Sequence, residues 1–173
     1  MSKRIVKIIG GGLAGCESAL QLLKRGFAVK MYEMRPEKTT GAHKSDSLAE
    51  LVCSNSLKST EPTTASGLLK EELDILGCAL LPLARECAVP SGSALSVDRV
   101  LFSKAVEREL NAYPDFTLVR EEVTSLDEDI PTIVASGPLT SDALAEQVGK
   151  ITGKDRLFFY DAIAPIVDFD SID

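Results

Sequence analysis

Residues 5–15 read IVKIIGGGLAG, and this stretch carries the strongest fold signal in the chain. The β-branched run at 5–9 predicts a strand, and Gly10, Gly12 and Gly15 follow it with the spacing of a dinucleotide-binding turn. The first glycine permits the tight turn, the second lets a pyrophosphate approach the backbone, and the third lets the next helix pack against the strand. The phosphates would then face free N–H groups at a helix N-terminus.

The residues after the turn fit the same unit. An apolar stripe at helical spacing runs from Leu13 to Leu23, and Gly26 is a good residue to end that helix. A second strand is predicted at 27–32, and Glu33 follows it, eighteen residues after Gly15. An acidic residue there can accept hydrogen bonds from the hydroxyls of an adenosine ribose. The alternative is a glycine loop that binds no ligand.

Composition limits the broad class of protein. With 173 residues and 45% hydrophobic residues, we expect one globular domain spanning residues 1–173. No apolar run is long enough to cross a bilayer, and the start lacks a small-residue cleavage site, so we expect a cytoplasmic protein with no membrane partner. The four cysteines form no CxxC pair and accompany a single histidine, which predicts free thiols and no metal site.

Charge is unevenly distributed along the chain. Residues 1–60 carry ten Lys and Arg against five Asp and Glu, whereas residues 61–173 carry nine against twenty-one, so a net +5 and a net −12 give the total of −7. The basic first third could face phosphates, and chance clustering of surface charge is the alternative.

The rest of the chain alternates strand and helix signals. A long polar segment at 34–64 is typical of a functional or mobile loop. Helices are predicted at 65–76, 98–110 and 141–149, and strands at 116–119, 132–135 and 157–160. We therefore predict an α/β fold with a parallel, doubly wound sheet. The apolar faces expected for the first two of these helices are Leu68, Leu69, Leu73 and Leu76, and Val100, Leu101, Ala105, Val106 and Leu110.

Two cysteines stand where their chemistry matters. Cys53 lies in LVCSNSL, inside the polar segment, where it is either a reactive thiol or a buried, inert one. Cys16 falls in the first turn of the predicted phosphate-binding helix, whose dipole could lower its pKa, although a packing role fits its residue type better.

Several other polar positions are candidates with ordinary alternatives. His43 is the only imidazole and lies on the polar segment, as either a surface or a catalytic residue. Arg99 opens a predicted helix and Gly137 ends a predicted strand, so both could contact a bound dinucleotide. The lysines that could meet phosphates, or simply face solvent, are Lys38, Lys44 and Lys58.

Taken together, GGGLAG, YEMRP at 32–36, AELVCSNSL at 49–57, GLLKEEL at 67–73, VDRVLFS at 97–103, ASGPLTS at 135–141 and the final YDAIAPIV and SID resemble the TrmFO family. These motifs span the chain. The resemblance implies a flavoprotein with a Rossmann-like FAD/NAD(P)-binding fold that transfers a methylene from methylenetetrahydrofolate to uridine C5 in the tRNA T-loop, with reduction by NAD(P)H. It implies Cys53 as the catalytic thiol. The cofactor-binding residues it implies are Gly10, Gly11, Gly12, Leu13, Ala14, Gly15, Glu33, Arg35 and Gly137.

The family is more than twice as long as this chain, which implies an incomplete, N-terminal FAD-binding segment. A sheet edge left uncovered in such a segment predicts self-association. Three alternatives stay open: a GidA/MnmG-like flavoprotein that modifies the tRNA wobble uridine, a catalytically inactive FAD-binding fragment, and a general flavin or NAD(P) oxidoreductase.

Overall fold

A central sheet of four parallel strands organises the computed structural model, which describes residues 4–126 and 129–153. Its order is β6-β2-β1-β7, formed by β1 (Ile5–Ile9), β2 (Ala28–Glu33), β6 (Phe116–Arg120) and β7 (Thr132–Val134). This order and the parallel pairing are those of a Rossmann-like fold, so the predicted α/β class is confirmed. The strand predicted at 157–160 lies outside the described residues.

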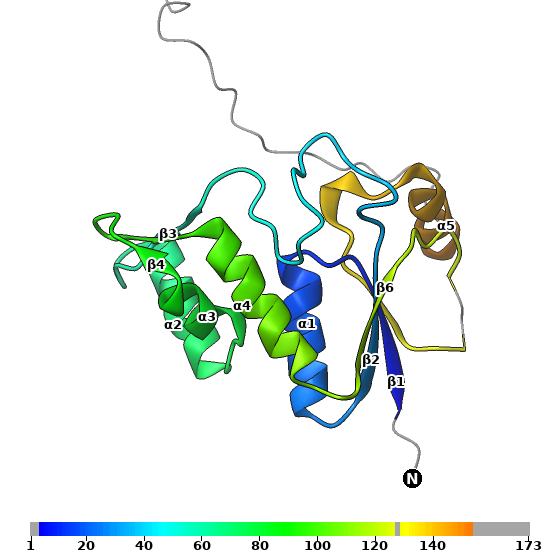
Figure 1. Ribbon diagram of the computed structural model, residues 1–173, viewed down its shortest axis with the longest axis horizontal. Helices are drawn as coiled ribbons and strands as arrows, with labels where there is room; N and C mark the ends of the chain where they lie inside the picture. The colour runs from blue at the N-terminus through cyan, green and yellow to red at the C-terminus, as the bar shows by residue number, and fades with distance from the viewer. Residues whose placement is uncertain (1–3, 127–128, 154–173) are drawn as a thin grey trace, which may run out of the picture.

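Helices cover both faces of this sheet (Figure 1). On one face α1 (Leu13–Lys24) packs with α4 (Arg99–Asn111) over Ile8 and Met31, which pair in register and are fully buried. On the other face α5 (Asp142–Thr152) buries Leu144 in a smaller cluster with Ile9. Because apolar side chains leave both faces of the sheet, the chain is wound on both sides of it.

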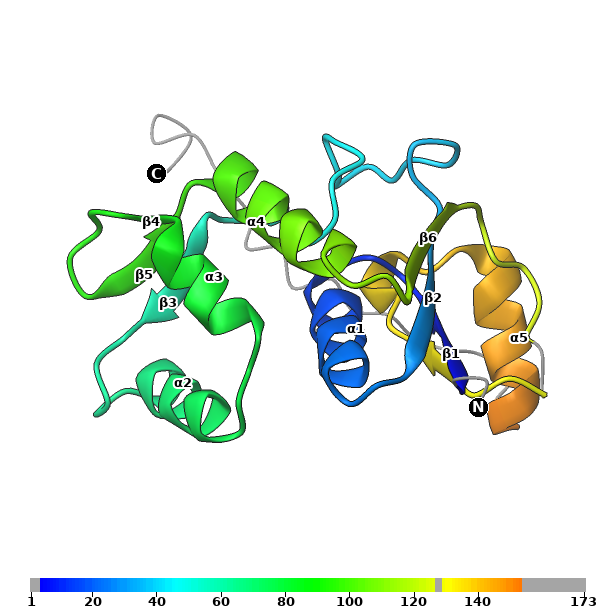
Figure 2. The same cartoon turned by 60° about the horizontal axis from the view of Figure 1, so that its bottom comes forward.

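A second, smaller unit interrupts the expected alternation (Figure 2). It contains an antiparallel sheet of order β3-β5-β4, from β3 (Ser56–Ser59), β4 (Ala88–Val89) and β5 (Ala94–Val97). Two helices belong to it, α2 (Ala65–Ile75) and α3 (Leu80–Glu86). The sequence predicted neither this sheet nor α3, whose first turn contains Pro82, a position where proline costs no helical hydrogen bond.

A carboxylate joins the two units. Glu17, on α1, accepts hydrogen bonds from the backbone N–H groups of Ala79 at 2.9 Å and Leu80 at 3.0 Å. These groups lie at the start of α3, where no side chain of the helix's own N-cap residue satisfies them. Burial opposes the charge, but the hydrogen bonds outweigh it and lower the pKa of Glu17. The ionised side chain therefore serves as a cap supplied from another helix.

The apolar face predicted for α2 is mostly wrong, because of its four leucines Leu73 alone packs against the core. Leu68 and Leu69 are 50% and 53% exposed, and Leu76, just after the helix, is 74% exposed. The buried positions of the helix are Gly67 and Lys70 instead. Lys70 Nζ donates to the backbone carbonyls of Ser59 at 2.9 Å and of Ser66, which offsets the cost of turning an ammonium inward. The apolar spacing thus indicated the helix and Leu73, but not the rest of the side that packs.

The predicted core face of α4 is partly wrong. Val100 and Leu101, in its first turn, are 61% and 54% exposed, whereas Phe102 is fully buried. Asp98 caps the helix by accepting from the N–H groups of Val100 and Leu101, which holds this turn at the surface. Ala105, Val106 and Leu110 are buried as predicted. No helix among residues 4–126 and 129–153 is long and apolar enough to span a membrane.

Phe102→Ala tests which face of α4 stabilises the fold. We expect it to lower the free energy of unfolding by about 3–5 kcal/mol, because a fully buried ring leaves a cavity. The neighbouring Leu101→Ala is the matched control and should cost about 0.5 kcal/mol or less, since its side chain faces solvent. Urea denaturation followed by circular dichroism measures both values. Equal losses for the two variants would contradict this packing.

Candidate dinucleotide-binding site

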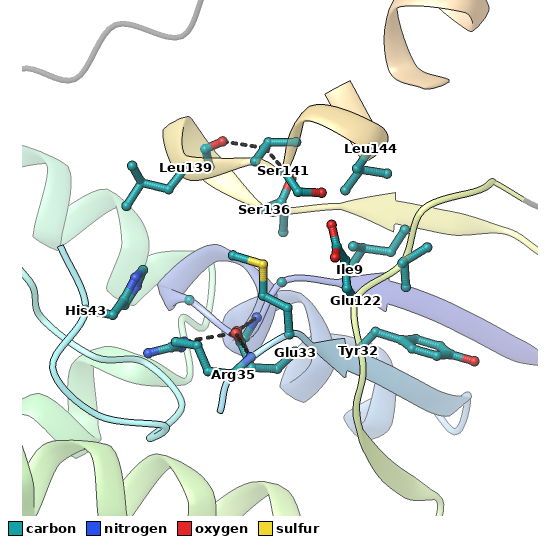
Figure 3. Close-up of a pocket in the computed structure, with 18 of the residues that line it drawn as sticks. Ile9, Tyr32, Glu33, Arg35, His43, Glu122, Ser136, Leu139, Ser141 and Leu144 are labelled. Atoms are coloured by element: carbon teal, nitrogen blue, oxygen red, sulfur yellow. Dashed lines mark hydrogen bonds and ion pairs between the residues drawn. The ribbon is translucent and has the colours of Figure 1, made fainter. Parts of the chain in front are cut away.

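A pocket of about 260 Å³ opens at the carboxyl ends of the central strands (Figure 3). Its walls come from the turn after β1, the residues that follow β2, the segment at 121–123 after β6, and residues 135–144 after β7. In open parallel sheets the ligand crevice forms at this end, where neighbouring strands send their helices to opposite faces. The fold thus places the glycine turn in the wall of a cavity.

The glycine turn has a different steric constraint at each position. Gly10 has φ +105°, and a Cβ added there would lie 2.5 Å from the carbonyl oxygen of Ala135. A Cβ on Gly15 would lie 1.9 Å from the carbonyl oxygen of Gly10, so α1 can approach the turn only through a glycine. Gly12 has no heavy atom within 4 Å of its added Cβ, which leaves room for a ligand beside the backbone.

The start of α1 is prepared for an anion. Gly12 is the N-cap, so no side chain caps the helix, and its first turn holds no acidic residue. Leu13 and Ala14 line the pocket in this turn. Backbone N–H groups in the first turn have no partner inside the helix, and the helix dipole adds a partial positive charge. The geometry therefore fits a phosphate group.

Glu33, the last residue of β2, has a buried carboxylate that accepts hydrogen bonds from the glycine turn and from Arg35. Its Oε2 accepts from the N–H of Gly11 at 2.8 Å, and its Oε1 accepts from the N–H and the Nε of Arg35 at 3.1 and 2.9 Å. Burial alone would raise the pKa of Glu33, but the bonds from Arg35 and Gly11 outweigh it and lower the pKa. The carboxylate is ionised at neutral pH and fixes the turn against the residues after β2.

Arg35 extends this arrangement into the long polar segment. Its side chain is 2% exposed, and Nη1 donates to Glu50 Oε2 at 2.8 Å and to the carbonyl of Ser45 at 3.1 Å. Arg120, at the end of β6, donates to the backbone carbonyl of Arg35 at 3.1 Å. The segment expected to be a loop is thus held in place by buried charge pairs, and two of its own residues, Leu48 and Ala49, are buried in the core.

The structure brings most predicted cofactor residues together. The pocket is lined by Gly10, Gly11, Gly12, Leu13, Ala14, Glu33, Arg35 and Gly137. Gly15 is buried under the turn, in the packing role predicted for it. His43 also lines the pocket, whereas Arg99 is exposed at the start of α4 and does not. Lys38 forms an ion pair with Glu122 at 2.7 Å.

The cysteines separate by environment. Cys53 is exposed, so the buried alternative for it is wrong, and it follows Val52, which lines the pocket. Cys16 is fully buried and its Sγ donates to the carbonyl of Gly11 at 3.3 Å. Burial raises the pKa of Cys16 to about 12, and this overrides any lowering by the dipole of α1. The packing role expected of Cys16 fits this environment.

Sequence reasoning missed part of the pocket. Glu50 lies in the AELVCSNSL motif, but its pairing with Arg35 was not predicted, because the two residues are fifteen positions apart and become close only in the fold. Glu122, Ser136 and Ser141 line the wall opposite His43. Ser136 and Ser141 belong to the ASGPLTS motif, and all three residues also had a positional signal, since the residues just after β6 and β7 must reach the same end of the sheet as the glycine turn.

The parallel sheet, its glycine turn and the acidic end of β2 define a Rossmann-like dinucleotide-binding domain. GidA from Aquifex aeolicus shares the fold, with a TM-score of 0.59 and 16% identity over 79% of this chain and 26% of that one. Over residues 5–173 the sequence matches the family described as Glucose inhibited division protein A, and the chain belongs to this family.

Curated relatives are much more similar in sequence. Methylenetetrahydrofolate--tRNA-(uracil-5-)-methyltransferase TrmFO of Bacillus subtilis is 53% identical over 173 residues, which are 100% of this chain and 40% of that protein. The protein of the same name from Solibacter usitatus is 56% identical over 100% of this chain and 39% of its own length. The chain therefore spans about two fifths of the length of these relatives.

Two glycine substitutions compare the stability cost of a methyl group at a tightly packed position and at an open position of the turn. Gly15→Ala should lower the free energy of unfolding by about 3 kcal/mol or more, because the new methyl group overlaps the carbonyl of Gly10. Gly12→Ala should cost about 1 kcal/mol or less, because only a preferred N-cap residue is lost. Thermal and urea unfolding measure both. A Gly15→Ala protein as stable as the parent would contradict the packing.

Proposed function

We propose that the chain is the FAD-binding part of a folate-dependent tRNA uracil-5-methyltransferase. The observation that carries this proposal is the pocket at the glycine turn, in a chain that is 53% identical along its whole length to a relative of that name. The same names favour uracil C5 methylation over wobble-uridine modification as the reaction. A general oxidoreductase would share the glycine turn but has no reason to share identity along the whole chain.

The residues present fit FAD. The backbone N–H groups of Leu13 and Ala14 would receive the pyrophosphate, with Gly12 leaving room for it. Glu33 would bind the adenosine ribose. A carboxylate accepts about four hydrogen bonds, and Glu33 already accepts three, so one site on Oε2 is left for a ribose hydroxyl. Arg35 and Gly137 complete the lining on either side.

When bound, FAD would supply one-carbon carriage and electron storage, and this chain's residues would bind and orient it. Cys53 is proposed to act on the nucleic-acid substrate. Its thiolate would add to C6 of the uracil ring, and the electron pair displaced from the C5–C6 bond would make C5 nucleophilic. Once the C5 proton is lost and the one-carbon unit is reduced to a methyl group, the C6–S bond would break and release the thiolate. Its exposure and its place next to pocket-lining Val52 support this role.

The co-substrates follow from the balance of this chemistry. Methylenetetrahydrofolate would donate the one-carbon unit at the oxidation level of formaldehyde, so two electrons are needed to leave a methyl group on C5. We propose NAD(P)H as their source and tRNA as the acceptor, in the cytoplasm, where the free thiols of the described residues would persist. A second candidate is FAD binding without turnover, because these residues span about two fifths of the relatives' length.

Self-association is proposed through the edge strand β7. It has one neighbour, β1, among the described residues, and Val134 at its end is 42% exposed. An open edge offers unpaired backbone groups to a second strand.

FAD binding by the chain is the first test. We expect the purified protein to retain or take up FAD, seen as a shifted visible spectrum and quenched flavin fluorescence, and Arg35→Met to weaken binding by at least tenfold. Lys150→Met, which removes an exposed cation that pairs with Glu146, is the matched control and should bind as the parent does. Light scattering on the same sample should show oligomers. Failure to bind any FAD would overturn the cofactor proposal, and a clean monomer at high concentration would overturn the edge-strand proposal.

Methyl transfer is the second test. The chain extended by the remaining residues of the Bacillus subtilis relative should incorporate label from methylenetetrahydrofolate into unmodified tRNA when NAD(P)H is present. Cys53→Ala should abolish incorporation, because no thiolate remains to add to C6. Cys78→Ser is the control and should stay active, since its side chain can still donate to Glu17. Undiminished incorporation by Cys53→Ala would remove the thiol from the mechanism.

A further inference from the structure

The imidazole of His43 is held in one orientation at the pocket wall. Its Nδ1 lies 2.6 Å from Thr40 Oγ1, and the same hydroxyl oxygen accepts from the backbone N–H of His43 at 3.3 Å. His43 lines the pocket and lies on the same side as Arg35 (Figure 3). Nε2 makes no hydrogen bond to any residue that the structure describes, so this nitrogen is available to a ligand.

Arg35 leaves a second group available. Its backbone N, Nε and Nη1 all donate to partners, whereas Nη2 has none within the described ranges. No fully buried side-chain nitrogen or oxygen there lacks a hydrogen bond, so Nη2 retains some accessible surface, and Arg35 is one of the residues that line the pocket. A guanidinium nitrogen and an imidazole nitrogen thus remain for the same ligand, on one wall of the pocket.

The charges around these two groups do not favour an anion on their own. Arg35 is paired with both Glu33 and Glu50, so two carboxylates face one guanidinium. Burial and the Arg35 charge lower the pKa of His43, and the two carboxylates only partly oppose this, so the ring is neutral at pH 7. The first turn of α1 adds no acidic residue and about half a positive charge. A pyrophosphate with two negative charges therefore meets a shortage of positive charge.

We propose that His43 supplies this missing charge: its imidazole takes up a proton when a dinucleotide phosphate enters the pocket, and then donates from Nε2 to a phosphate oxygen beside Arg35 Nη2. The inference rests on the proposed binding of FAD and adds to it a proton-coupled phosphate contact. It makes His43 a binding residue for the cofactor's phosphates, outside the glycine turn.

The proton balance is simple. One proton comes from solvent. In the protonated ring Nδ1–H donates to Thr40 Oγ1, and Nε2–H points to the phosphate oxygen, whichever nitrogen carried the hydrogen before. Thr40 accepts from both the ring and the backbone N–H of His43, as a hydroxyl oxygen with two lone pairs can. The hydroxyl hydrogen of Thr40 turns away from the ring.

Because His43 is the only histidine in the chain, its imidazole signals can be assigned in an NMR titration without ambiguity. We expect FAD and ADP to raise the pKa of His43 by about one unit or more, since a phosphate would lie within hydrogen-bonding distance of Nε2. Adenosine, which lacks the phosphates, should leave the pKa unchanged. A pKa raised by the ligand means tighter binding in acid, so FAD affinity should fall up to about tenfold as pH rises from 5.5 to 8.

Two variants complete the test. His43→Gln keeps an amide donor but cannot titrate, so its FAD affinity should lose the pH dependence while binding persists. Lys44→Gln removes a neighbouring exposed cation and should keep the pH dependence, whatever its effect on affinity. If FAD binds while the pKa of His43 stays unchanged, or if His43→Gln keeps the pH dependence, the inference is overturned and the proposed function stands. If neither FAD nor ADP binds, both are overturned.

Discussion

The buried carboxylate of Glu33 is the interaction on which the candidate site depends. It links the N–H of Gly11 to the side chain and backbone of Arg35, so one ionised group fixes both the glycine turn and the start of the long polar segment. Two carboxylate oxygens that accept three N–H groups need little else to stay charged in a buried place. Without this charge Arg35 would lose one of its two acidic partners, and Gly11 would lose the partner of its N–H.

The glycine turn combines residues that allow close packing with a residue that leaves space for a ligand. Gly10 and Gly15 are glycines because backbone carbonyls occupy the space of a side chain, and Gly12 is one because the space beside it is open. The three glycines therefore have different physical reasons, as their places in the pattern predict. Gly12 leaves room beside the backbone, Gly15 sets how closely α1 approaches the turn, and Gly10 sets how closely the residues after β7 approach it.

The elements that could be predicted from sequence are those whose signals are local. The β1-α1-β2 unit follows from a β-branched run, three glycines and a helical stripe, and the structure reproduces it within a residue or two. The small antiparallel sheet could not be predicted, because β3 and β5 are four-residue strands whose pairing joins Ser56 to Ser96. The burial of Lys70 on the inward face of α2 could not be predicted either, since it depends on backbone carbonyls from β3 and α2 that accept hydrogen bonds from its ammonium group.

The candidate site divides in the same way. Its glycines and Glu33 were evident from spacing, whereas Glu50 and the open nitrogen of Arg35 emerge only when the polar segment folds back over the sheet. The folded segment also buries the side chain of Arg35 and leaves that of Cys53 exposed. Arg35 is held by buried charge pairs, while Cys53 lies farther along the same segment and is exposed. The role proposed for Cys53 requires a thiol that a macromolecular substrate can reach, and the role proposed for Arg35 requires a side chain in a fixed position. The segment after β2 can meet both requirements because Arg35, near its start, is tied to Glu33, whereas Cys53 lies at an exposed position beyond buried Leu51.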